Sequence, residues 1–475
     1  MALKSLFVRG VFWNFLEKVV VKSSSFVIGI VLARILSPRD YGLMGMLAVF
    51  IALSNIIIEG GFAKALVQKK NCCEVDYSTA FFTNLGVSLI LYLVLFFSAP
   101  LISRFYNEPK LVEILRVLSA NFVIGSLNVV QRAQLTRNMD FKSLAQINFF
   151  GVITGGIAGI IMAYTGFGVW ALVGQTIVHT LVMSIIFPLF SKWRPKTIFS
   201  RESFKQLFGF GSKLMVTGVV ATVVNNISTI AIGKVYKSDQ LGYYTRATQF
   251  SELVALTIYD VIGAVSFPAL SSLQDERQRM VALYKKTLLF VAMTVFPVMV
   301  LMALLAKPLV VILLTEKWLP CVLMLQVLCF ARMLTPLSAV NLNILNAIGR
   351  SDLFMKIDFI KIPMIIITLA VTIPIGVEAI VWGNLATTVI SFFVNTYYPK
   401  KIFGYGALEQ IRDYKYIIIS LILMSGAVLL FVGFVPNPWI QLLCGCLIGA
   451  AVYISACLAF KVIDAEMIKN LLKRA

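Results

Sequence analysis

Residues 32–42 read Leu-Ala-Arg-Ile-Leu-Ser-Pro-Arg-Asp-Tyr-Gly and join two long apolar stretches of the chain. The stretch before them covers 11–34 and the stretch after them covers 41–59. Each is long enough to cross a bilayer as a helix, which takes about 20 apolar residues. Ser37 and Pro38 lie at the junction, where a helix breaker is expected. The segment therefore predicts two transmembrane helices joined by a short turn.

The same pattern continues along all 475 residues, of which 59% are apolar, against about 45–50% in a soluble globular protein. The mean hydropathy is +0.89. We therefore predict an all-α polytopic membrane protein with about 14 transmembrane helices. The expected spans cover 11–34, 41–59, 79–99, 111–130, 144–164, 168–190, 207–232, 243–268, 287–306, 319–340, 354–374, 378–398, 416–434 and 439–460.

Charge and rare residues exclude several classes of protein. The formal net charge is +20, but a soluble nucleic-acid-binding protein would not be this apolar. With a cytoplasmic N-terminus, 27 Lys and Arg residues flank the spans on the cytoplasmic side and 8 on the other side, which predicts that both termini are cytoplasmic. His179 is the only histidine, so sites and relays that need two or more histidines are excluded, and we expect no metal or resident cofactor.

An internal repeat appears at an offset of 200 residues. Residues 232–242, Ile-Gly-Lys-Val-Tyr-Lys-Ser-Asp-Gln-Leu-Gly, align with 32–42, so that Gly242 matches Gly42. Six spans separate the copies, an even number that predicts parallel repeats of the kind found in transporters. The alternative is that two helix ends share similar turn chemistry. We expect two pseudo-symmetric lobes around a central cavity. The first lobe contains spans 1–6 (residues 1–195) and the second contains spans 7–12 (196–400). Spans 13 and 14 (401–475) are expected at the periphery.

Charged side chains within the predicted spans each cost about 2.5–3.5 kcal/mol at a helix centre and therefore need compensation. Lys18 and Lys22 share one helical face, and Arg246 shares another with Asp260. A shared aqueous cavity explains these faces, and buried structural pairs are the alternative. The candidates to bind an anionic head group are Lys18, Lys22, Arg246 and Arg332; those to line the cavity are Asn14, Asn225, Asn226 and Gln249; those to bind a coupling ion are Asp260, Glu17, Glu59 and Asp358.

Two of these assignments have a competing interpretation. Lys361 follows Asp358 by three residues, and an ion pair within one helix is the alternative to ligand binding by Lys361. The polar stripe with Asn225 and Asn226 can hydrogen-bond hydroxyl-rich groups or join neighbouring helices. A cationic cavity fits a diphosphate head group on a long lipid, because lysine and arginine bind phosphate and the lipid tail can remain in the bilayer.

Several segments resemble one family. They are Ala33-Arg-Ile-Leu-Ser-Pro-Arg-Asp-Tyr-Gly42, Glu59-Gly-Gly-Phe-Ala-Lys-Ala-Leu-Val-Gln68, Gln131-Arg-Ala-Gln-Leu-Thr-Arg-Asn-Met-Asp-Phe141, Leu241-Gly-Tyr-Tyr-Thr-Arg246 and Phe267-Pro-Ala-Leu-Ser-Ser-Leu-Gln274. As a set they are similar to the Wzx-type polysaccharide and O-antigen flippases, the colanic-acid-exporter-like branch of the multidrug/oligosaccharidyl-lipid/polysaccharide exporter superfamily.

The resemblance implies a non-enzymatic flippase of the bacterial inner membrane. Such a protein moves an undecaprenyl-diphosphate-linked oligosaccharide to the periplasmic leaflet by alternating access coupled to Na⁺ or H⁺, for export of O-antigen, capsule or exopolysaccharide. Its expected partners are this substrate, membrane lipids, a polysaccharide polymerase and a chain-length regulator, and no nucleic acid. The alternatives are a drug or cation exporter or a lipid II flippase of the same superfamily, or a membrane-embedded polysaccharide polymerase.

Overall fold

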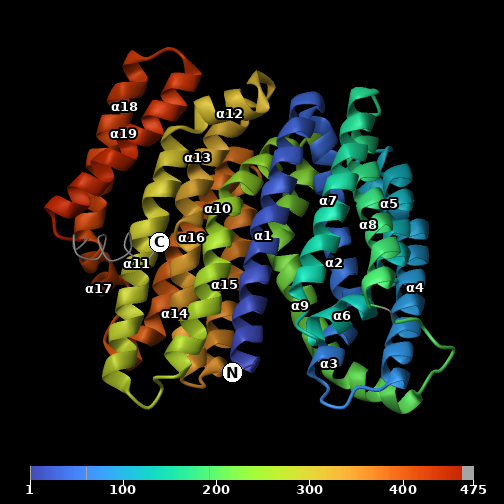
Figure 1. The fold of residues 1–475 in the computed structure, drawn as a ribbon. Helices are drawn as coiled ribbons and strands as arrows, with labels where there is room; N and C mark the ends of the chain where they lie inside the picture. The colour runs from blue at the N-terminus through green and yellow to red at the C-terminus, as the bar shows by residue number, and fades with distance from the viewer. Residues whose placement is uncertain (1, 60, 192, 463–475) are drawn as a thin grey trace. The chain divides into compact units, whose positions relative to one another are not determined.

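The fold is described from a computed structural model that places residues 2–59, 61–191 and 193–462. Side-chain surroundings are described for these residues except 2–12, 14–19, 59, 213–214, 260–261 and 264–265. Within the placed ranges the chain forms helices joined by short turns, with no β-strand (Figure 1). The predicted all-α class is therefore confirmed.

The chain divides into two compact units, Met1–Gly242 and Tyr243–Ala475. The first contains α1 (Ala2–Ile35), α2 (Pro38–Glu59), α3 (Phe62–Gln68), α4 (Glu74–Tyr106), α5 (Leu111–Ser126), α6 (Val129–Arg137), α7 (Phe141–Tyr164), α8 (Val169–Ser191), α9 (Arg201–Val235) and the start of α10 (Ser238–Ser271). The second contains the rest of α10, α11 (Arg277–Leu304), α12 (Ala306–Leu314), the 3₁₀ helix η1 (Glu316–Trp318), α13 (Cys321–Arg332), α14 (Thr335–Ala347), α15 (Ser351–Thr372), α16 (Val377–Phe403), α17 (Ala407–Asp413), α18 (Lys415–Phe434) and α19 (Pro438–Ala459).

Ten helical segments of the described chain are long and apolar enough to cross a membrane. The pair α5 and α6, bent by 43° at the break between them, makes an eleventh. The expected count of about 14 is not confirmed. Helices α1, α10 and α15 do occupy the predicted spans 11–34, 243–268 and 354–374, but they are not among the ten. Charged side chains within these helices lower their apolar character.

The turn between α1 and α2 is fixed by local hydrogen bonds. The backbone N–H of Ser37 donates to the Asp40 carboxylate at 2.9 Å, and the N–H of Asp40 donates to the Ser37 hydroxyl at 3.3 Å. This reciprocal pair is a capping box. Pro38 occupies the first helical position, where it has no backbone N–H that would need a partner. The predicted break at Ser37 and Pro38 is therefore where α2 begins.

The structure repeats this geometry 200 residues later. Helix α1 ends at Ile35 and α2 begins at Pro38, while α9 ends at Val235 and α10 begins at Ser238. The aligned sequence copies therefore form the same helix-turn-helix element with the same bounds.

Equivalent glycines of the two copies pack reciprocally. A Cβ atom built on Gly42 would overlap the carbonyl oxygen of Ser238, and one built on Gly242 would overlap the carbonyl oxygen of Pro38. Glu108, in the turn between α4 and α5, accepts a hydrogen bond from Arg39 at 3.0 Å and another from the Ser238 hydroxyl at 2.8 Å. Backbone contacts and a carboxylate bridge therefore hold the two turns together.

Candidate functional site

The unit Met1–Gly242 contains a cavity of about 1180 Å³. Typical pockets for small molecules measure about 300–1000 Å³, so this cavity can hold a large ligand. Residues from eight of the unit's helices line it, namely α1, α2, α3, α5, α6, α7, α8 and α9. The cavity therefore lies within the helical bundle of this unit.

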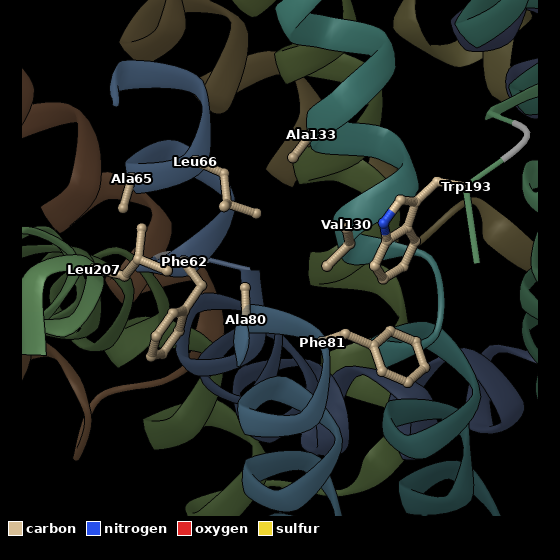
Figure 2. Packing of buried hydrophobic residues seen from close by; sticks show 9 residues of the cluster. All are labelled: Phe62, Ala65, Leu66, Ala80, Phe81, Val130, Ala133, Trp193 and Leu207. Atoms are coloured by element: carbon tan, nitrogen blue, oxygen red, sulfur yellow. The ribbon is translucent and has the colours of Figure 1, made fainter. Parts of the chain in front are cut away.

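Helix α6 carries one side of the cavity. Asn128, at the start of α6, is followed at intervals of four residues by Arg132 and Thr136, and all three line the cavity. Residues four apart lie on one face of a helix. On another face, Val130 is fully buried in an apolar cluster (Figure 2). The short helix therefore presents a polar stripe to the cavity and an apolar side chain to the protein core.

Helix α3 is built in the same way. Lys64 and Gln68 line the cavity, whereas Phe62 and Leu66 are buried. These buried side chains belong to the cluster that Figure 2 shows, which we call the support cluster. Its members come from α3, α4, α6, the segment before α9 and α9 itself: Phe62, Ala65, Leu66, Ala80, Phe81, Val130, Ala133, Trp193 and Leu207. The support cluster fixes both short helices and thereby the positions of Lys64 and Arg132.

Hydrogen bonds at the end of α3 add to this support. The Arg137 guanidinium donates to the carbonyl oxygens of Leu66 at 2.8 Å and Lys70 at 2.6 Å, which are groups that the end of a helix leaves unsatisfied. The Lys69 ammonium lies 2.8 Å from the buried carboxylate of Asp76. This hydrogen bond raises the pKa of Lys69 above its usual value, so the ammonium stays charged at neutral pH.

The cavity lining is cationic. Lys22 from α1, Lys64 from α3 and Arg132 from α6 line it, and none of its described lining residues is Asp or Glu. A cleft lined by charges of one sign raises the local concentration of ligands of the opposite sign. This lining therefore favours an anion, and the arginine and lysines suit phosphate in particular.

The rest of the lining includes amide, hydroxyl and imidazole groups. His179 on α8 lies against α7, where a Cβ on Gly155 would come within 2.8 Å of the His179 Cβ. The side-chain oxygens of Asn121 and Asn128 have no hydrogen-bond partner among the described atoms. Buried polar groups without a partner are uncommon in proteins.

Of the four predicted head-group cations, the structure places Lys22 at this cavity. The side chain of Lys18 lies outside the described residues. Arg246 belongs to the other unit, where it is only 6% exposed, donates to Gln249 at 2.8 Å and lies 5.8 Å from the centre of the Trp318 ring. Arg332, in the same unit, forms an ion pair with Glu252 at 3.0 Å. Each of these two arginines therefore has a structural partner.

The predicted polar residues are scattered. Asn226 donates to the carbonyl oxygen of Thr222 on its own helix at 2.9 Å, and Asn225 is exposed. Thr222 lines the cavity, but Asn225 and Asn226 do not. Gln249 accepts the hydrogen bond from Arg246, and the side chain of Asn14 lies outside the described residues.

Among the predicted ion-coupling acids, Asp358 is described. It pairs with Lys361 on α15 at 2.9 Å, as the alternative interpretation expects. The side chains of Glu17, Glu59 and Asp260 lie outside the described residues. Within the described part of the chain, no three His, Cys, Asp or Glu side chains gather as metal ligands would.

Four cavity-lining residues are not among those predicted from the sequence: Lys64, Arg132, Asn121 and Asn128. Lys64 and Arg132 fall between the predicted spans, because α3 and α6 have 7 and 9 residues and are each too short to cross a membrane. The spacing of four residues between Asn128, Arg132 and Thr136 is the signal that could have found this polar helical face.

The fold is shared with solved structures of membrane transporters. It superposes on the lipid II flippase MurJ in its inward closed conformation with a TM-score of 0.76 at 16% identity, covering 95% of this chain and 98% of the other. It also superposes on an inward-facing multidrug resistance MATE family transporter of the MOP superfamily with a TM-score of 0.62 at 17% identity, covering 79% and 93%. At these identities the likeness shows a shared fold.

The sequence comparison defines the family. Residues 31–323, more than half of the chain, match the family model described as "Polysaccharide biosynthesis protein", and the chain belongs to this family. The lipopolysaccharide biosynthesis protein WzxC of Escherichia coli K12 is 25% identical over 402 residues, which are 83% of this chain and 82% of that protein. The resemblance to Wzx-type polysaccharide flippases is thus confirmed.

Proposed function

We propose that this protein moves an undecaprenyl-diphosphate-linked oligosaccharide from the cytoplasmic to the periplasmic leaflet. The observation that carries the proposal is the cavity of about 1180 Å³ with Lys22, Lys64 and Arg132 in its lining. A diphosphate provides the negative charge that these cations favour, and each charge-assisted hydrogen bond to it contributes about 1.5–3 kcal/mol. The amides of Asn121 and Asn128 suit sugar hydroxyls, which donate hydrogen bonds.

The charge of the lining favours this substrate over the alternatives. A drug or cation exporter is expected to favour acidic over basic groups near its ligand, and the described lining residues are basic or uncharged. The family match and the similarity to WzxC favour a surface-polysaccharide precursor over lipid II. Transporter folds of the MurJ and MATE type favour transport over polymerisation, and we propose that the protein is not an enzyme.

The proposed mechanism is alternating access in the bacterial inner membrane with both termini in the cytoplasm. Movement between the two states is coupled to Na⁺ or H⁺, for which Asp260, Glu17 and Glu59 are the candidate acids. Asp358 is the weaker candidate, because it already pairs with Lys361. A polysaccharide polymerase and a chain-length regulator are the proposed partners.

Depletion of the protein tests the function. We expect a lipid-linked oligosaccharide to accumulate and to react with an impermeant sugar-oxidising reagent in inside-out vesicles but not in right-side-out vesicles. Re-expression should remove the accumulated pool. An unchanged pool, or one that reacts equally in both kinds of vesicle, would contradict the proposal.

Labelling of Cys73 tests the orientation. This exposed cysteine precedes α4, on the side predicted to be cytoplasmic, so an impermeant maleimide should label it in inside-out vesicles only. Neighbouring Cys72 should react more slowly, because burial raises the pKa of its thiol and reduces the reactive thiolate at neutral pH. As a control, Lys110→Cys in the opposite turn should be labelled in right-side-out vesicles. The reverse pattern would invert the orientation.

A further inference from the structure

A second pocket lies in the unit Tyr243–Ala475, between α11, α17 and α18, and measures about 380 Å³. Four of its lining residues are basic: Lys285, Lys286, Arg412 and Lys415. One lining residue, Asp413, is acidic. The side chains of all five are exposed, so the pocket presents a formal excess of positive charge to a ligand from outside.

The carboxylate of Asp413 in this pocket already accepts a hydrogen bond. The Tyr405 hydroxyl donates a hydrogen bond to the Asp413 carboxylate at 2.7 Å. The same tyrosine ring lies 4.6 Å from the Lys285 ammonium, in the geometry of a cation–π contact. Tyr405 is buried and thereby fixes both charged groups, which leaves the pocket basic.

The cations lie where two helices become apolar. No charged residue follows Lys286 in α11 up to Leu304, and none follows Lys415 in α18 up to Phe434. One helical turn beyond these lysines are Phe290, 52% exposed, and Ile419, 40% exposed. Residues four apart lie on one face of a helix, so each lysine has an exposed apolar side chain next to it on the side of the apolar stretch. The basic groups followed by exposed apolar side chains are complementary to a phospholipid, which has a charged head group followed by apolar acyl chains.

We propose that this pocket binds the phosphate-bearing head group of an anionic phospholipid. Basic pockets at the cytoplasmic ends of membrane helices attract anionic lipids, and the guanidinium of Arg412 can bind a phosphate through two parallel hydrogen bonds. The acyl chains then lie against the apolar faces of α11 and α18. The site is separate from the cavity of the first unit and does not depend on the proposed transport function.

Native mass spectrometry of the purified full-length protein tests the site. Phosphatidylglycerol is titrated against the protein, with phosphatidylcholine as a lipid of no net charge. The site variant carries Lys285→Gln, Arg412→Gln and Lys415→Gln. A matched variant loses the same charge at exposed positions of the other unit through Lys196→Gln, Arg201→Gln and Lys205→Gln. Each basic group near a lipid surface contributes about fivefold in affinity, so the site variant should bind phosphatidylglycerol roughly a hundredfold more weakly.

The proposal requires that the matched variant binds phosphatidylglycerol as the unaltered protein does, and that the thermal midpoints of both variants are unchanged. Equal weakening in the two variants would show general electrostatic attraction and overturn the site. Binding of inorganic phosphate alone, with no preference for phosphatidylglycerol over phosphatidylcholine, would overturn the assignment to a lipid.

Discussion

Replacing Arg132 with glutamine is expected to lower export of the lipid-linked oligosaccharide per membrane-inserted molecule by about tenfold to a hundredfold. A charge-assisted hydrogen bond contributes about 1.5–3 kcal/mol, and 1.4 kcal/mol corresponds to a factor of ten. Lys22→Gln should have an effect of similar size, because Lys22 lines the same cavity. The measurement is export divided by the amount of variant in the membrane, as determined by immunoblot.

Lys70→Gln is the matched control. Lys70 is exposed beyond the end of α3 and does not line the cavity, so its replacement should leave export unchanged. Arg246→Ala should instead lower the amount of folded protein, because it removes the contacts with Gln249 and Trp318. Equal export per molecule by the Arg132, Lys22 and Lys70 variants would refute the cationic cavity as the substrate site.

Gly242→Ala is expected to lower the thermal midpoint of the purified protein by several degrees. The new methyl group would overlap the carbonyl oxygen of Pro38. This oxygen belongs to the backbone, so it cannot move aside by a change of rotamer as a side-chain atom can. Overpacking of this kind costs about 1–3 kcal/mol. Gly42→Ala should cost a similar amount, since it meets the carbonyl oxygen of Ser238 in the equivalent way.

Gly209→Ala provides the control for the glycine substitutions. Gly209 lies within α9, and a Cβ there would have no neighbour within 4 Å. Alanine is also the better helix former by about 1 kcal/mol, so this variant should be as stable as the unaltered protein or more stable. Midpoints for the Gly42 and Gly242 variants that match that of Gly209→Ala would contradict the reciprocal contact.

The sequence predicts the features that depend on local pattern. Apolar segments of sufficient length predict the helical class. The aligned segments 32–42 and 232–242 form matching turns, although the predicted spans end at 34 and 232 and the helices end at Ile35 and Val235. Polar spacing along span 1 predicts a polar face that includes Lys22, which lines the cavity.

The features that the sequence does not predict depend on contacts between distant segments. Arg246 donates a hydrogen bond to Gln249 on its own helix, but it also contacts Trp318, 72 residues further along the chain. Lys64 and Arg132 reach the cavity only because the support cluster holds two short helices against the long ones. Helical periodicity predicts which face of a helix a residue lies on, but it does not predict which other segment packs against that face.

The reciprocal glycine contact within this single chain has the same symmetry as the interface of a homodimer. In a two-fold symmetric interface, residue i of one copy meets residue j of the other, and residue j meets residue i. Gly42 meets Ser238 and Gly242 meets Pro38, and the equivalent positions 42 and 242, like 38 and 238, are 200 residues apart. Two separate polypeptides that each carried one copy of this turn can make the same contact. The contact is thus the one expected if an ancestral gene was duplicated and fused after its product had already formed dimers.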